Sequence, residues 1–224
     1  MLESRFPRIP GDMGNATTWD FPVLYKIIKN ASPDAVVRKG DKGLLAPFIQ
    51  GAKELEGEGV RAITTNCGFL AMFQEEMAEA VDVPVFTSSL MQVPLVYAML
   101  KPSQKVGIIT IHGKSLTQTH LCAVGADKVP HVVVGTEGEE ELSRVILDDE
   151  MELDVEKSTG EMLKVASKMV SDYPEVGAIV LECTNMTPYA AAIQREIGLP
   201  IFDIYTLVSM VYESAVRREF SGYM

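Results

Sequence analysis

The sequence predicts an α/β protein made of two similar α/β/α halves, with parallel sheets related by a pseudo-two-fold axis. The main observation is a stretch that occurs twice, once around Cys67 and once around Cys183. Subtracting 67 from 183, or 86 from 202, gives 116, so the copies align without a gap. Each copy reads as an apolar β-branched run, a polar turn, a helical stretch and a second apolar run. The copies are AITTNCGF (62–69) with VPVF (83–86), and AIVLECTN (178–185) with LPIF (199–202).

The remaining elements alternate between strands and helices, as parallel α/β sheets require. Residues 1–20 hold two prolines in 7–10 and glycines at 11 and 14, which indicates a loop. Residues 21–30 fit either a strand or a helix. In the first half we expect strands at 35–37, 60–64 and 83–86, and helices at 46–55, 69–81 and 90–100, the last with a kink or late start at Pro94. In the second half we expect strands at 106–111, 129–134, 176–181 and 199–202, and helices at 115–124, 138–147, 162–173 and 188–197.

The domain organisation follows from the repeat. Residues 101–104 (KPSQ) are the best linker, so the first half is expected at 1–101 and the second at 102–205. A last helix at about 206–218, within the C-terminal segment 206–224, is expected to pack on the first half. The ligand is expected in the cleft between the halves, at the carboxyl ends of the strands, where both cysteines fall.

The repeat also predicts a missing element. The strand that opens the second half begins at Val106, which is 77 residues before Cys183 (183 − 106). The same count back from Cys67 ends before Met1 (67 − 77 = −10). We therefore expect the first half to lack or shorten its opening strand, and the chain to start downstream of a natural N-terminus.

Composition excludes several classes of function. Of the 224 residues, 47% are hydrophobic and 23% charged, which is ordinary for a globular protein. The net charge of −11 disfavours nucleic acid as a partner. No apolar run has membrane-spanning length and no signal peptide is evident, so a cytoplasmic protein is expected. Three cysteines argue against a disulfide scaffold, and no C-x-x-C suggests zinc, so we expect no metal.

Two cysteines that face one cleft suggest proton transfer. A carbanion formed α to a carboxylate is planar, so a base on one face and an acid on the other invert the centre. A cysteine at a helix N-terminus is favoured as thiolate by the dipole and the unpaired N–H groups. The same donors can hold a carboxylate. This scheme requires no cofactor, and no nucleotide-binding motif is present.

At these residues the chain resembles the aspartate/glutamate racemase superfamily, which includes cofactor-independent amino-acid racemases, hydantoin racemases, maleate isomerases and arylmalonate decarboxylases. The likeness rests on TTNCG around Cys67, on ECTN around Cys183, and on the two-half layout. The segment GDMGNAT at 11–17 is similar to a loop of aspartate racemases that borders the active site. The chain departs from the family where Gly68-Phe69 replaces Asn-Thr and where Glu182 replaces a frequent glycine. On a strand, Glu182 should point away from the side that Cys183 occupies.

The resemblance implies an amino-acid racemase or epimerase of the aspartate/glutamate type, with Cys67 and Cys183 as acid and base and a small carboxylate as substrate. Maleate-isomerase-like or decarboxylase-like chemistry, or a non-catalytic paralogue that binds a small acid, are the alternatives. A homodimer is expected because the family often dimerises. The expected substrate-binding residues are Met13, Asn15, Thr65, Asn66, Gly68, Thr184 and Asn185, with Arg8, Asp12 and His112 as further candidates.

Overall fold

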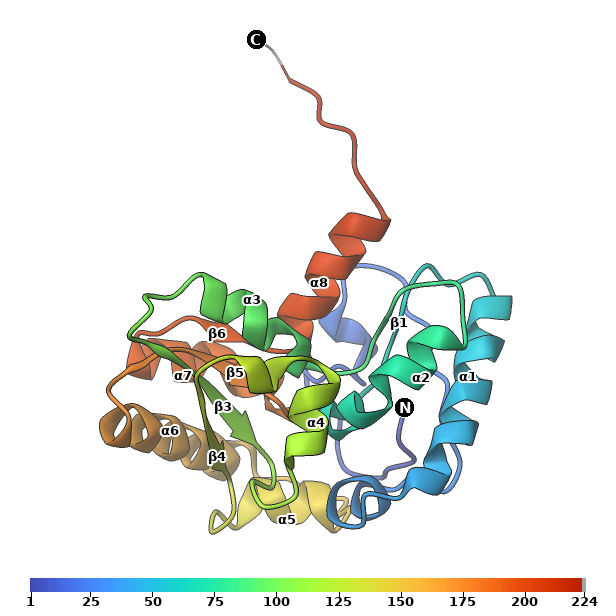
Figure 1. Ribbon diagram of the computed structural model, residues 1–224. Coiled ribbons are helices and arrows are strands. Elements are labelled where there is room, and N and C mark those ends of the chain that lie inside the picture. Colours follow the sequence, from blue (N-terminus) through green and yellow to red (C-terminus); the bar gives the residue numbers. More distant parts are fainter. Residues whose placement is uncertain (223–224) are drawn as a thin grey trace.

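A computed structural model describes residues 1–222 and shows two α/β halves side by side (Figure 1). The second half holds a four-stranded parallel sheet in the order β4-β3-β5-β6. Its strands are β3 (Lys105–Thr110), β4 (His131–Gly135), β5 (Val176–Leu181) and β6 (Ile201–Phe202). The first half pairs β1 (Ile63–Thr64) with β2 (Val85–Phe86), also in parallel. The predicted fold class is confirmed.

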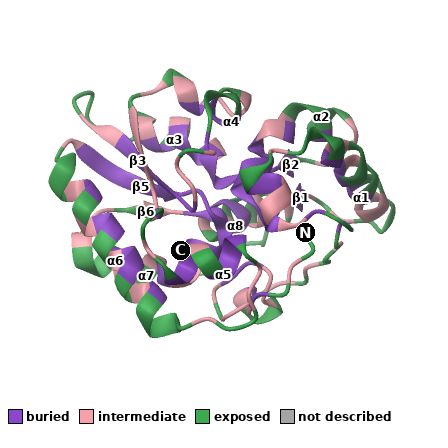
Figure 2. Cartoon of the chain, turned by 90° about the horizontal axis from the view of Figure 1, so that it is seen from below, coloured by how far each residue is buried: buried purple, intermediate pink, exposed green. Residues whose placement is uncertain are grey.

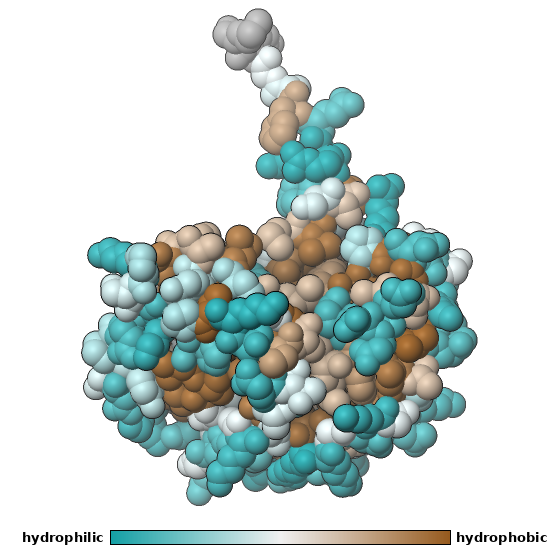
Figure 3. All heavy atoms as spheres, in the orientation of Figure 1, coloured by the Kyte–Doolittle hydropathy of each residue, from teal (hydrophilic) through white to brown (hydrophobic). Residues whose placement is uncertain are grey.

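Helices cover both faces of the larger sheet. The helices are α1 (Leu45–Gly57), α2 (Gln74–Glu79), α3 (Val93–Ala98), α4 (Gln118–Ala123), α5 (Glu141–Leu147), α6 (Val155–Asp172), α7 (Ala190–Ile197) and α8 (Ile204–Ala215). All six residues of β5 are buried, as expected for a central parallel strand covered on both sides. Figure 2 shows the buried residues concentrated along β3 and β5. Polar residues cover most of the periphery in Figure 3, and hydrophobic ones show at the base of α8.

Several predicted elements are wrong or misplaced. Residues 35–37 form no strand but lie in a π-helical turn, Asp34–Arg38, where Asp34 forms an ion pair with Arg38 one turn later. Residues 21–30 form neither strand nor helix, apart from one parallel bridge between Leu2 and Ile28. The helix expected at 162–173 begins earlier, because Asp154 caps α6 by accepting a hydrogen bond from the Lys157 N–H. Pro94 gives the predicted late start: a 3-10 turn, Ser89–Gln92, precedes α3.

The C-terminal helix is shorter than the predicted segment 206–224. It ends at Ala215, and the following residues, 216–222, lead away from both halves (Figure 1). Residues 223 and 224 lie outside the described residues. The buried side of α8 packs against Met13, Trp19 and Phe86 of the first half.

The first-half sheet has an open edge. Within residues 1–222, β1 pairs only with β2, whereas the equivalent β5 is flanked by β3 and β6. The predicted lack of an opening strand is therefore observed. A largely apolar cavity of about 470 Å³ borders β1, and its walls include Trp19, Phe21, Phe86 and Tyr212. None of the described helices is long and apolar enough to cross a membrane.

Candidate active site

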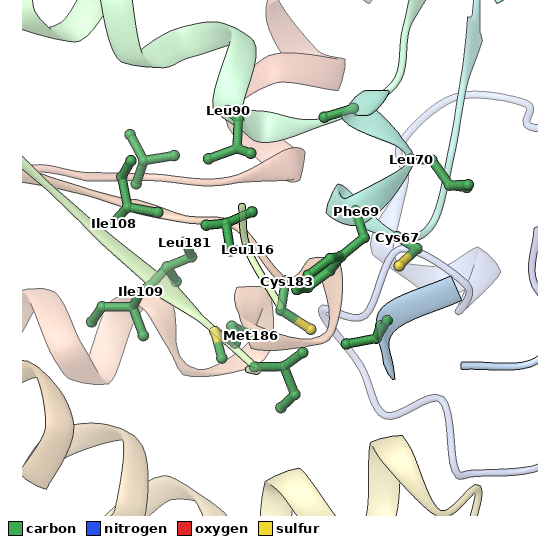
Figure 4. Close-up of a cluster of buried hydrophobic side chains, with 14 of the residues drawn as sticks. Cys67, Phe69, Leu70, Leu90, Ile108, Ile109, Leu116, Leu181, Cys183 and Met186 are labelled. Carbon is green, nitrogen blue, oxygen red and sulfur yellow. The ribbon is translucent and has the colours of Figure 1, made fainter. Parts of the chain in front are cut away.

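The two repeat-related cysteines lie at equivalent places in the two halves. Cys67 follows β1 and directly precedes a 3-10 helix, Gly68–Phe73, while Cys183 follows β5 and precedes a 3-10 helix, Thr184–Tyr189. Both are buried, with 8% and 6% of their surface exposed, and both line one small cavity. Figure 4 shows the sulfur of Cys183 pointing toward the side of Cys67. The structure thus brings the two thiols to one site between the halves.

The shared cavity is closed. Its volume is about 10 Å³, which is room for roughly one water molecule. Besides the cysteines, its walls are formed by Leu2, Phe6, Pro33, Val37, Asn66, Gly68, Phe69, Ile111, Ile146, Glu182 and Asn185. A substrate of several heavy atoms therefore requires the walls to move apart. The part of the wall outside the repeat comes from the segments around Phe6 and Val37 and from Ile111 and Ile146.

A hydrogen-bonded chain holds the thiol of Cys183. Its Sγ lies 3.6 Å from the acceptor Oδ1 of Asn185, and Asn185 Nδ2 donates to Asp12 Oδ2 at 2.6 Å. Asp12 is 2% exposed and also accepts from Arg8 Nη1 at 3.1 Å and from the Gly14 N–H at 2.7 Å. The loop at 11–15 is therefore tied to the second cysteine, as its predicted place beside the site requires.

Asn66 and Thr184 connect the halves. Thr184 Oγ1 donates to the carbonyl oxygen of Asn66 at 2.6 Å, and Asn66 Oδ1 accepts from the Leu2 N–H at 2.7 Å. Thr65 does not face the cavity; its hydroxyl donates to the carbonyl oxygen of Thr87 at 2.6 Å. Thr184 and Thr65 thus hold the two loops in place within the closed structure.

Three predicted residues lie away from the thiols. Met13 packs in the α8 cluster and borders the larger cavity. Asn15 caps the short 3-10 helix Ala16–Thr18 and donates to the carbonyl oxygen of Arg8. His112 Nδ1 lies 2.7 Å from Ser115 Oγ and is not part of the cavity wall. Apolar packing holds Met13, and local hydrogen bonds hold Asn15 and His112, in directions away from the thiols.

Glu182 is the site residue that sequence reasoning placed wrongly. We expected it to point away from the cleft, yet it borders the cavity with both cysteines. Its side chain is fully buried; Oε2 accepts from the Thr110 hydroxyl at 2.6 Å, and Oε1 packs beside Gly68 of the first half. The repeat held the signal, because 182 − 66 = 116 makes Glu182 the counterpart of Asn66.

Burial dominates the electrostatics of this site. It raises the pKa of Cys67 to about 12, with the nearby charge of Glu182 as the second cause, and raises the pKa of Cys183 well above its ordinary value for the same two reasons. Backbone N–H groups of Phe69 and Leu70 act in the opposite direction on Cys67 but are outweighed. The expectation that helix N-termini favour thiolates is therefore wrong for this closed structure. Burial also raises the pKa of Glu182 to about 7.

The raised pKa of Glu182 predicts a pH-dependent stability. Between about pH 4.5 and 7 the folded chain keeps the proton that the unfolded chain loses, so stability falls as pH rises through this window. Glu182→Gln cannot ionise, and its stability relative to the parent should grow by about 2 kcal/mol between about pH 5.5 and pH 8. Urea unfolding at both pH values measures this. If the free energy of unfolding differs between Glu182→Gln and the parent by the same amount at both pH values, the raised pKa of Glu182 is contradicted.

Comparison with known proteins assigns the fold family. A model of the Asp/Glu/hydantoin racemase family matches residues 28–208. The chain belongs to this family. Among solved structures, a mutant of arylmalonate decarboxylase in a sulfate-associated form superimposes with a TM-score of 0.63 at 15% identity, covering 97% of this chain and 93% of that one. Allantoin racemase from Klebsiella pneumoniae gives 0.58 at 18% identity over 76% and 65% of the two chains.

Relatives with sequences more similar to this chain bear a different name. A dimethylsulfoniopropionate lyase from Durusdinium sp. clade D is 29% identical over 90% of this chain and 69% of its own length. Dimethylsulfoniopropionate lyase 7 from Emiliania huxleyi is 27% identical over 92% of this chain. This chain spans 62% of the Emiliania protein. The family and these relatives are enzymes, and the lyases share the fold of the racemases but are named for another reaction.

Proposed function

We propose that this protein is a lyase that removes the proton α to the carboxylate of a small acid, with dimethylsulfoniopropionate as the substrate. The observation that carries the proposal is that both cysteines line one buried cavity. The similarity to named dimethylsulfoniopropionate lyases over about nine tenths of the chain supports the choice of substrate.

The reaction balances with one base. A thiolate takes a proton from the carbon next to the carboxylate. The C–H electron pair forms the new C=C bond, and the electrons of the breaking C–S bond leave with sulfur. The products are acrylate, dimethyl sulfide and the protonated thiol. Because dimethyl sulfide leaves as a neutral molecule, no acid is needed, whereas racemisation needs a second group on the opposite face.

Cys183 is the better base of the two. Its thiol is oriented by Asn185, which is itself fixed by Asp12. Among the described residues no side chain is hydrogen-bonded to the Cys67 thiol, which meets the backbone N–H groups of Phe69 and Leu70 and lies beside the apolar ring of Phe69 (Figure 4). A thiol with a raised pKa yields a strongly basic thiolate, which suits abstraction from a weakly acidic carbon.

An amino-acid racemase or epimerase is the second candidate. The pseudo-equivalent placement of Cys67 and Cys183 on one cavity favours it, since this supplies an acid and a base on opposite sides of one ligand. The racemase members of the family support this candidate as well.

A substrate panel in deuterated water separates the candidates. The purified protein is incubated with dimethylsulfoniopropionate and, separately, with each enantiomer of aspartate and glutamate. We expect dimethyl sulfide in the headspace and acrylate in solution from the first, and no α-deuterium in the amino acids. Deuterium at Cα together with the opposite enantiomer, and no dimethyl sulfide, would instead establish the racemase. If no substrate yields dimethyl sulfide and none takes up α-deuterium, both candidates are rejected.

A further inference from the structure

Two repeat-related residues each carry a buried polar atom that lacks a partner. Asn66 and Glu182 directly precede Cys67 and Cys183, and both border the shared cavity. Within residues 1–222, Asn66 Nδ2 and Glu182 Oε1 are buried and have no hydrogen-bond partner. Buried polar atoms are nearly always paired, so an unpaired one in a cavity wall indicates a ligand contact. Here one atom is a donor and the other an acceptor, one from each half.

The Glu182 carboxyl also lacks a counter-ion. Among the described residues, no Lys, Arg or His forms an ion pair with it. The nearest titratable groups are Cys67 and Cys183, and the charge of Glu182 raises the pKa of both thiols. Around them, Arg8 is paired with Asp12, Tyr189 is hydrogen-bonded to Ser158, and His120 of α4 faces the ring of Phe69. A buried carboxylate without a cation is costly, and a cationic ligand relieves that cost.

The rest of the wall determines which cation fits. Apart from the cysteines and amides, the lining side chains are aliphatic or aromatic. A primary ammonium has three N–H groups to satisfy, and Glu182 Oε1 is the one unpaired side-chain oxygen among the described lining residues. A methylated sulfonium or ammonium has no N–H groups, and its methyl surface packs favourably on apolar and aromatic walls.

We propose that Glu182 determines substrate specificity by facing a methylated cationic group, while Asn66 Nδ2 receives the carboxylate at the other end of the same small ligand. This deepens the proposed lyase function, on which the identity of the substrate rests, and it assigns a role to a residue outside the cysteine pair. Because the closed cavity holds about one water, the ligand enters as the walls separate.

Gly68 makes the arrangement sterically feasible. A Cβ at this position would lie 2.1 Å from Glu182 Oε1 and 2.3 Å from its carbonyl oxygen. The bare backbone of the first half therefore leaves the space that the carboxylate of the second half occupies. Glu182 and Gly68 are a matched pair across the two halves.

Two non-cleavable ligands of nearly equal shape test the proposal. One is 3-(trimethylammonio)propanoate, and the other is 4,4-dimethylpentanoate, in which a carbon replaces the cationic nitrogen. Titration calorimetry at pH 8 should show the cationic ligand binding the parent protein about 30-fold more tightly. 3-Aminopropanoate, a primary ammonium, should bind more weakly than its trimethyl analogue. Since burial holds the pKa of Glu182 at about 7, affinity for the cationic ligand should rise with pH and level off above that value.

Three substitutions test which residues produce the preference for the cationic ligand. Glu182→Gln should reduce the preference for the cation to about threefold or less. Glu175→Gln removes the same charge at the far end of β5, where Glu175 pairs with Lys105, and should leave the preference unchanged. Asn66→Ala should weaken both ligands alike, since both carry the carboxylate. Circular dichroism checks that each variant is folded.

The result that overturns the proposal needs no variant: equal affinity of the parent for the two ligands, or binding of neither. A preference that survives Glu182→Gln also overturns it. Release of dimethyl sulfide is measured separately. Lyase activity without a preference for the cationic ligand rejects only the role of Glu182. A preference for the cationic ligand without release of dimethyl sulfide rejects the lyase function and leaves the binding role of Glu182 in place.

Discussion

Replacing Cys183 by serine should lower kcat for dimethylsulfoniopropionate cleavage about 1,000-fold, whereas Cys67→Ser should lower it only about tenfold. Serine keeps the shape and the hydrogen bond to Asn185, but its hydroxyl is far too weak an acid to supply an anionic base. Cys67 lines the same cavity but transfers no proton in a one-base elimination, so its loss perturbs the base only indirectly. Headspace measurement of dimethyl sulfide under saturating substrate gives the two rates.

The exposed cysteine provides the control. Cys122 lies on the surface of α4, and Cys122→Ser should leave kcat unchanged. Losses of equal size at positions 67 and 183 would contradict a one-base elimination and favour the two-base racemase. A larger loss at position 67 than at 183 would reverse the assignment of the base.

Gly68→Ala should destabilise the protein by about 3 kcal/mol. The added Cβ would overlap both the carboxyl and the carbonyl oxygen of Glu182, and the carbonyl belongs to backbone that cannot move without disturbing the end of β5. Urea unfolding near pH 7 measures the effect. Shortening Glu182 should recover only part of the loss, since the carbonyl clash remains.

Gly160→Ala is the matched control for this substitution. Gly160 lies inside α6, and beyond the adjacent residues and backbone of its own helix nothing lies within 4 Å of a Cβ built there. Alanine at this position should stabilise the protein by up to about 1 kcal/mol, because it favours the helix. A neutral Gly68→Ala would show that the two halves are not packed against each other at Glu182.

The repeat made most of the fold predictable. A single offset of 116 placed both cysteines after equivalent strands, and the count of 77 from Val106 indicated that the first sheet lacks a strand. These inferences succeed because strand-turn-helix units are defined by local periodicity. Irregular segments have no such periodicity: Val36 and Val37 are β-branched, but a helical turn buries them instead of a strand.

The candidate site was predictable in position more than in detail. Strand order brings Cys67, Asn66, Cys183 and Asn185 to one place. Side-chain directions depend on contacts that periodicity does not reveal: Met13 packs on the distant helix α8, and His112 bonds to Ser115 in its own loop. Glu182 was misplaced because alternation along an ideal strand does not hold at position 182, where β5 has already ended. Thiol acidity was misjudged because burial depends on the whole fold rather than on the adjacent helix.

The unequal sheets have a mechanical consequence. Cys183 follows a six-residue strand held on both sides. Cys67 follows a two-residue strand that has one neighbour within residues 1–222 and borders a cavity of about 470 Å³. Local opening costs least where backbone bonds and packing are fewest. We therefore expect Cys183, the proposed base, to stay fixed, while the wall around Cys67 opens locally to admit the substrate and then closes over it.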